Sequence, residues 1–212
     1  MRKKGTERVM SRGFLVVLAG LALAFAVLTG LAVEKGILAP KQQTVAIGGP
    51  FHLTGTSGRP VDQGVLKGKW SAVYFGYTFC PDACPTTLFA LGQAEQALGA
   101  RAADFQTVFI SVDPARDTPK VMANYVRTPA FPQHLVGLTG SPAQVAQAAH
   151  DYKVFYQPAG SGPDYSVNHS SFTYLMNPKG DFVCVIPYDT TPKEIAARVE
   201  KAMSQGAGAQ SC

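Results

Sequence analysis

The chain has 212 residues, of which 46% are hydrophobic and only 16% are charged. This composition is sufficient for a packed core and excludes wholesale disorder. The formal net charge of +5 comes mainly from residues 1–13, which hold five basic side chains and one acidic one. The rest of the chain is nearly neutral and shows no basic stripe, so we expect no binding to nucleic acid.

Residues 14–33 form an uncharged run of 20 residues directly after the basic N-terminus. As a helix rising about 1.5 Å per residue, the run would span about 30 Å, the thickness of the hydrocarbon core of a bilayer. We interpret it as one transmembrane anchor rather than a cleaved signal peptide, whose apolar stretch usually has only about 7–15 residues. The positive-inside rule then places residues 1–13 in the cytoplasm. In a bacterium this predicts a single-pass inner-membrane protein with its soluble domain in the periplasm, where disulfides persist.

After a linker at residues 34–44, strand and helix patterns alternate over residues 45–204, and residues 205–212 read as a frayed, flexible tail. Strands are expected at 71–77, 105–112, 135–138, 172–176 and 182–186, and helices at 86–98, 120–126, 142–150 and 194–203. Such alternation predicts an α/β fold with parallel strands and helices on both faces of the sheet. A final hairpin followed by a helix is typical of the thioredoxin-like fold.

Two cysteines, Cys80 and Cys84, lie in GYTFCPDACPTTL, between an expected central strand and an expected helix. Sites in α/β proteins form at the carboxyl ends of parallel strands, which is where this segment falls. Pro85 suits the first position of the helix, and the free N–H groups there favour a thiolate at Cys84. Cysteines four residues apart can share a metal ion or form a disulfide, so a metal site and a redox-active pair both remain open.

Two thiolates need a third ligand to hold a metal ion well, and the four histidines are the candidates. His150 ends an expected helix, His134 lies in a loop, and His52 lies in a short strand. His169 is in a polar loop that leads into a strand of the same expected sheet, which makes it the best candidate. Two thiolates and one imidazole suit Cu(I), whereas structural zinc normally takes a fourth ligand.

The segment SVDPARDTPK follows the second expected strand and leads into a helix. Thr118 is a natural N-cap before proline. Asp113, Arg116 and Asp117 are expected to form a local charged network, which either caps the helix or supports the site.

The other two cysteines receive no functional role. Cys184 alternates with apolar residues in FVCVI, so we expect a buried strand residue. Cys212 is the last residue of the chain and is expected to be mobile.

Three motifs, GYTFCPDACPTTL, DPARDTP and NHSSFTYLMNPKG, occur in this order. Together they resemble the Sco/SenC family of copper-binding assembly proteins over residues 45–203. The resemblance implies a thioredoxin fold and copper ligation by Cys80, Cys84 and His169. It also implies delivery of copper to the dinuclear copper centre of cytochrome c oxidase subunit II, or reduction of the cysteines of that centre. Asp113 matches an acidic position of the family, and Asn168 replaces its usual Asp; both are expected beside the metal ligands.

Three functions therefore compete. A copper metallochaperone would take copper from a donor on the same side of the membrane and pass it on without turnover. A thiol–disulfide oxidoreductase would need the two cysteines and a thiol reductant but not His169. A peroxiredoxin-type peroxidase would need Cys80 alone, and neither Cys84 nor His169 serves such an enzyme.

Overall fold

The computed structural model describes residues 12–34 and 46–212, and the chain divides near residue 45 into two compact units. The first unit contributes helix α1 (Arg12–Glu34). Within this helix, solvent exposure is described for residue 13 and for residues 15–31. Among the residues that the structure describes, no helix is both long enough and apolar enough to cross a membrane. Most of the predicted basic N-terminus and linker, residues 1–11 and 35–45, lies outside the described residues.

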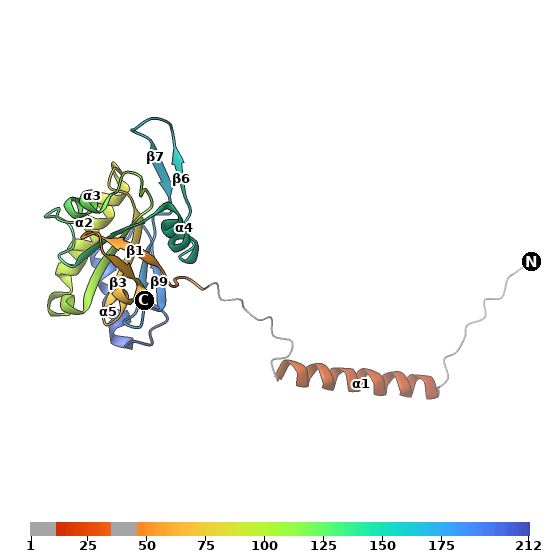
Figure 1. Cartoon of the computed structure of the whole chain (residues 1–212). Helices are drawn as coiled ribbons and strands as arrows, with labels where there is room; N and C mark the ends of the chain where they lie inside the picture. The colour runs from red at the N-terminus through yellow and green to blue at the C-terminus, as the bar shows by residue number, and fades with distance from the viewer. Residues whose placement is uncertain (1–11, 35–45) are drawn as a thin grey trace, which may run out of the picture. The chain divides into compact units, whose positions relative to one another are not determined.

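The second unit is built on a mixed sheet with the strand order β2-β1-β5-β4-β3-β8-β9 (Figure 1). Strands β3, β4 and β5 run parallel to one another, while β8 and β9 complete the sheet as an antiparallel hairpin. All seven residues of β3 and all seven of β4 are buried, as expected for central strands covered on both faces. The strands are β1 (His52–Gly55), β2 (Pro60–Asp62), β3 (Trp70–Gly76), β4 (Phe105–Ser111), β5 (Leu135–Thr139), β8 (Thr173–Met176) and β9 (Phe182–Ile186).

Three of the helices begin at an N-cap residue followed by proline, a pattern that can be recognised from the sequence alone. Thr118, Ser141 and Thr191 each accept a hydrogen bond from an amide of the first turn, and a proline follows each of them. The α-helices of this unit are α2 (Ala83–Ala97), α3 (Pro119–Tyr125), α4 (Pro142–Asp151) and α5 (Pro192–Gln205), and 3₁₀ turns cover Gln63–Leu66 and Gly99–Asp104.

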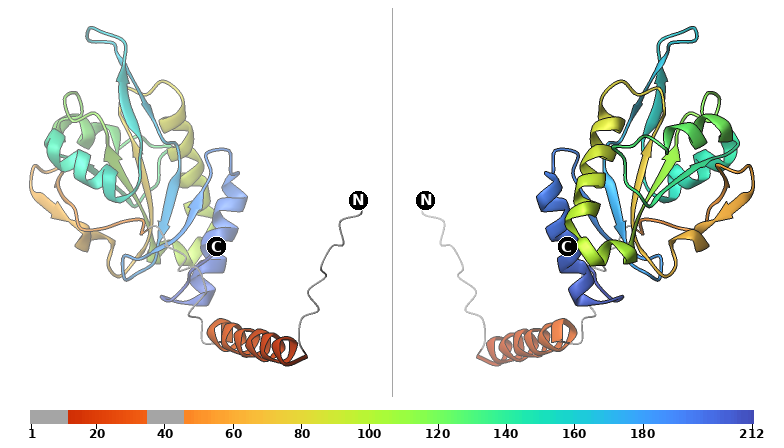
Figure 2. Two further views of the ribbon diagram at one scale, coloured as in Figure 1. Left: turned by 90° about the vertical axis from the view of Figure 1, so that its right-hand side faces the viewer. Right: turned by 90° about the vertical axis from the view of Figure 1, so that its left-hand side faces the viewer.

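Aromatic side chains fill the core on both sides of the sheet. On one face Tyr74 stacks on Phe109, whose ring lies 5.4 Å from that of Tyr125 in α3. On the other face Phe75 packs against Tyr152, at the end of α4, with ring centroids 5.2 Å apart. Figure 2 shows α2 and α5 side by side on one side of the sheet and α4 on the other.

A separate hairpin joins β6 (Tyr156–Ala159) to β7 (Ser166–His169) and projects beyond the main sheet (Figures 1 and 2). Tyr156 pairs with His169 at its base, next to the start of β8. The sequence predicts a loop at His169 instead, because Pro158 and the glycines of the turn mask the alternating pattern of two short strands. His169 is thus the last residue of a strand.

The C-terminal tail is fixed in place. Cys184 of β9 forms a disulfide with Cys212, and the Cα atoms are 6.0 Å apart. The side-chain amide of Asn177 donates a hydrogen bond of 2.9 Å to the carbonyl of Ala207, and Ala209 is only 4% exposed. The expectations of a frayed tail and a mobile Cys212 are therefore wrong, because a covalent link between distant residues leaves no mark on local periodicity. Cys184 is a strand residue as expected, but it is only partly buried.

Candidate metal centre

The two cysteines lie in a turn that connects the end of central strand β3 to helix α2. Cys84 is fully buried in the first turn of the helix, and Cys80 is half-buried in the preceding turn. The Cys84 amide points at the Cys80 sulfur, with 3.4 Å between N and Sγ, so an unpaired N–H of the helix terminus supports a thiolate at Cys80. The helix starts at Ala83, two residues before the predicted Pro85, which still falls in the first turn, where its missing N–H is tolerated.

A glycine at the end of β3 makes room for the buried sulfur. A Cβ atom at Gly76 would lie 2.6 Å from the Sγ of Cys84 and 2.8 Å from the ring of Phe109. Both contacts are far below van der Waals distance, and both neighbours are enclosed in the core. Gly76 therefore allows the Cys84 sulfur to lie directly against the strand.

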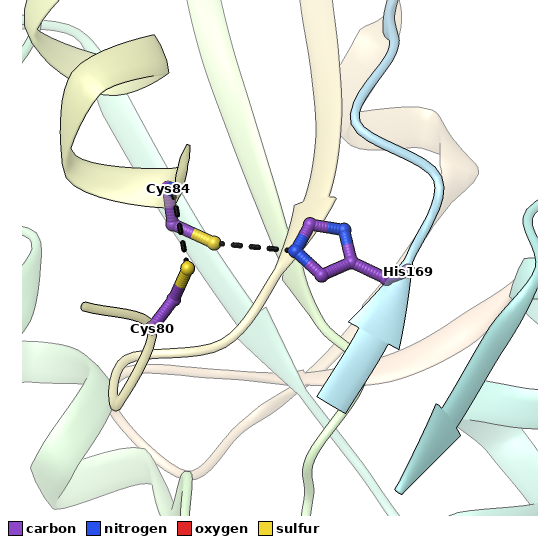
Figure 3. Close-up of side chains that lie close together, drawn as sticks. All are labelled: Cys80, Cys84 and His169. Carbon is purple, nitrogen blue, oxygen red and sulfur yellow. Dashed lines mark hydrogen bonds between the residues drawn. The ribbon is translucent and has the colours of Figure 1, made fainter. Parts of the chain in front are cut away.

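His169 brings a nitrogen to the sulfurs from the far side of the turn (Figure 3). Its Nε2 atom is 3.6 Å from the Sγ of Cys84, and its Nδ1 atom is 3.0 Å from the carbonyl oxygen of Ser170. The carbonyl accepts a hydrogen bond from the Nδ1–H group, which leaves the lone pair of Nε2 facing the sulfurs. The rings of Tyr74 and Tyr77 meet the imidazole edge-on and limit its rotation.

The arrangement has the dimensions of a three-coordinate metal site. The two sulfur atoms and the imidazole nitrogen all lie within 4.8 Å of one another, and this is the one such group of three found among the described residues. Bonds of about 2.3 Å to sulfur and about 2.0 Å to nitrogen at 120° would separate S from N by about 3.7 Å. The observed 3.6 Å between Cys84 Sγ and His169 Nε2 agrees with that value.

The two thiols differ in acidity because they share one hydrogen bond. The hydrogen bond from Cys84 lowers the pKa of Cys80 to about 3 against the opposing effect of burial, and hydrogen bonds from backbone amides add to the decrease. The same hydrogen bond, burial and the charge on Cys80 raise the pKa of Cys84. The pair therefore carries one thiolate and one retained proton. The thiolate is at Cys80, and the expectation of a thiolate at Cys84 is wrong, because the amide at the helix terminus points at the Cys80 sulfur. A metal ion that binds both sulfurs displaces the proton of Cys84.

The loop between β4 and α3 holds the cysteine turn in position. Asp117 is fully buried and accepts hydrogen bonds from the Thr78 amide at 3.0 Å, the Thr78 hydroxyl at 2.5 Å and the Ser111 hydroxyl at 2.5 Å. Burial raises the pKa of Asp117 despite these hydrogen bonds. The predicted network of Asp113, Arg116 and Asp117 therefore does not form one cluster. Asp117 bonds to Thr78 and so supports the turn that precedes Cys80, whereas Asp113 pairs with Arg116.

Asp113 and Asn168, predicted beside the ligands, lie elsewhere. Asp113 is buried, and its described side-chain partners are Arg116 and Tyr165 rather than a cysteine or a histidine. Asn168 is exposed and neighbours His169 along β7, so its side chain points to the opposite face of the strand. Asn replaces the family's usual Asp at a position that faces away from the sulfurs.

The other histidines have different surroundings. His134 pairs with the buried Glu95, and His150 lies beside Asp151 at the surface end of α4. His52 is exposed on β1. The structure therefore brings together Cys80, Cys84 and His169 and leaves the remaining histidines apart from them, as the sequence analysis expected.

Comparisons with known proteins agree on one family. A family model described as SCO1/SenC matches residues 39–204. A SCO2-like protein of Rickettsia felis is 38% identical over 157 residues, which are 73% of this chain and 76% of the relative.

Solved structures show the same likeness. The structure of Bradyrhizobium japonicum ScoI with copper bound is 43% identical, with a TM-score of 0.67 over 74% of this chain and 99% of that one. BsSco, described as having a disulfide switch and as a member of the Sco family of cytochrome c oxidase assembly proteins, is 25% identical. Its TM-score is 0.59, over 78% of this chain and 98% of that one. These likenesses confirm the predicted α/β, thioredoxin-like fold.

Proposed function

The chain belongs to the SCO1/SenC family, and we propose that it is a copper metallochaperone that binds copper through Cys80, Cys84 and His169. The observation that carries the proposal is the convergence of two sulfurs and one imidazole nitrogen within 4.8 Å. This soft, three-atom donor set suits Cu(I), which accepts trigonal coordination. A relative at 43% identity holds copper in its structure. Copper is the cargo of this site.

The recipient we propose is the dinuclear copper centre of cytochrome c oxidase subunit II. This assignment rests on the family resemblance and on the description of BsSco as belonging to a family of cytochrome c oxidase assembly proteins. A copper donor on the same side of the membrane would load the site. Transfer would proceed by exchange of ligands between the two proteins.

The location we propose is a bacterial inner membrane, with the soluble domain in the periplasm. Three observations support it: the uncharged run at residues 14–33, the basic residues before it, and the Cys184–Cys212 disulfide, which requires an oxidising compartment. We expect the full chain to stay in carbonate-washed membranes, and recovery in the soluble fraction would contradict the anchor.

The test of copper binding uses the full chain in detergent, kept anaerobic, with a Cu(I) chelator as competitor. We expect one copper per chain. Cys80→Ala or Cys84→Ala should abolish high-affinity binding, and His169→Ala should weaken it. His52→Ala, which removes an exposed histidine of β1, is the matched control and should bind as the parent does. Equal affinity of the His169→Ala variant and the parent would rule out the ligand assignment.

A second function is favoured by the acidity of one thiol. The half-exposed Cys80, with its lowered pKa and the Cys84 sulfur beside it, suits attack on a partner's disulfide. A thiol–disulfide oxidoreductase would use this pair to reduce the cysteines of the same copper centre or of another exported partner, and would not need His169. Dithiol exchange that survives in His169→Ala, together with unchanged copper binding, would favour the oxidoreductase.

A further inference from the structure

Arg116 lies between the β6–β7 hairpin and the cysteine turn. Its Nε atom donates a hydrogen bond to a carboxylate oxygen of Asp113, and its Nη1 atom donates one of 3.1 Å to the carbonyl of Pro163, near the hairpin tip. The hydroxyl of Tyr165 donates to the other oxygen of Asp113. We call Asp113, Arg116 and Tyr165 the latch. It joins the hairpin to the loop between β4 and α3.

Aromatic rings surround the guanidinium group of the latch. Its central carbon is 3.6 Å from the centroid of the Tyr165 ring, 4.8 Å from that of Phe79 and 5.7 Å from that of Tyr77. Tyr165 belongs to the hairpin, whereas Tyr77 and Phe79 belong to the turn that carries Cys80. The Arg116 and Asp113 side chains are only 14% and 3% exposed, so their attraction is less screened by water than that of a surface ion pair.

The β6–β7 hairpin needs contacts with the rest of the domain in order to be stable. It forms a two-stranded sheet of its own, and isolated two-stranded hairpins are marginally stable in water. A cavity of about 280 Å³, lined by Tyr77, Phe79, Tyr165 and their neighbours, separates it from the cysteine turn, so apolar packing between the two is incomplete. The latch supplies polar contacts where this packing is missing.

The latch and the candidate ligand lie on one face of the hairpin. Residues of a strand that are two apart face the same side, so Val167 and His169 of β7 point together toward the body of the domain, and Tyr165, directly before β7, bonds to the same side. Tyr165 makes the latch, Val167 is buried, and His169 reaches Cys84. At about 3.3 Å per residue, the latch is about 13 Å from His169 along the strand.

We propose that the latch of Asp113, Arg116 and Tyr165 holds the β6–β7 hairpin over the cysteine turn and thereby places the His169 imidazole against the sulfurs. The proposal rests on the proposed copper function. The three residues are positioning residues, since they touch neither sulfur. When the latch opens, the hairpin lifts and withdraws one of the three ligands, while both cysteines stay in place.

The first test needs no metal. In the copper-free full chain, hydrogen–deuterium exchange is measured for the parent, for Tyr165→Phe, which removes one hydroxyl and keeps the ring, and for Arg116→Gln. We expect exchange at residues 156–169 to quicken about tenfold in both variants, with the rest of the domain unchanged. The matched controls are Tyr188→Phe and Arg127→Gln, which alter exposed side chains outside the latch. Unchanged exchange in the hairpin would overturn the proposal.

The second test asks whether the latch acts through the imidazole. Tyr165→Phe should weaken Cu(I) binding about five- to tenfold, because the fraction of chains with the imidazole in place falls by that factor. In a His169→Ala background the same substitution should change nothing further. An equal loss in both backgrounds would show a general structural role and overturn the proposal. If the parent binds no Cu(I) but the latch variants still show faster hairpin exchange, the proposed copper function is refuted and the latch is supported.

Discussion

Removing the Cys184–Cys212 disulfide is expected to cost the second compact unit about 3.6 kcal/mol of unfolding free energy. The bond joins residues 28 apart and confines the unfolded chain. For a closed loop of about that length, the chain-entropy relation gives about 12 cal/mol/K, which at 25 °C is about 3.6 kcal/mol. A loss of this size is a large fraction of the 5–15 kcal/mol that is typical of whole domains.

The assay is urea unfolding of the parent and of the double variant Cys184→Ala/Cys212→Ala, followed by circular dichroism. The parent treated with a thiol reductant is the matched comparison and should unfold as the double variant does. Cu(I) affinity should be unchanged, because neither cysteine belongs to the group formed by Cys80, Cys84 and His169. A loss below about 1 kcal/mol would refute the entropic reasoning and show that the tail is already ordered in the unfolded ensemble.

Further predictions concern the cysteine turn. Gly76→Ala should weaken Cu(I) binding at least about tenfold, since the new methyl group would displace the Cys84 sulfur; Gly208→Ala, in open space, is the control, and equal affinities would contradict the prediction. Iodoacetamide should modify Cys80 about as fast at pH 6 as at pH 8, because its pKa is lowered; a rate that climbs steadily over that range would argue against a thiolate. Asp117 has a raised pKa, so the folded state takes up its proton before the unfolded state does, and the carboxyl adds stability as the pH falls from neutrality toward about 4. Asp117→Asn should therefore lose more unfolding free energy than the parent between pH 7 and about 4.5, and equal losses would disprove the assignment.

The sequence predicted those parts of the fold that local patterns determine. Central strands β3 and β4 show as apolar runs, and the cap at Thr118 with its proline marks the start of α3. Hairpin β6–β7 was missed because a proline lies within its first strand and glycines form its turn. The disulfide was missed because local patterns do not reveal contacts between residues 28 apart.

The site was predictable to a different extent for each of its parts. Cys80 and Cys84 are four residues apart, so one motif contains both. His169 is 85 residues from Cys84, and only its place before an expected strand and the family resemblance singled it out. The supporting contacts of Asp117 and Arg116 depend on side-chain directions that no spacing rule predicts. The family resemblance implied a place near the metal for Asn168, but strand alternation turns its side chain away.

The unequal burial of the two sulfurs has a consequence for exchange with another protein. Cys84 has no exposed surface, whereas Cys80 lies in a half-open turn beside the exposed ring of Phe79. An incoming thiolate therefore reaches the Cys80 sulfur more readily than the enclosed Cys84 sulfur. Departure of the cargo would then follow a fixed sequence, in which the outer sulfur is released early and the enclosed one last.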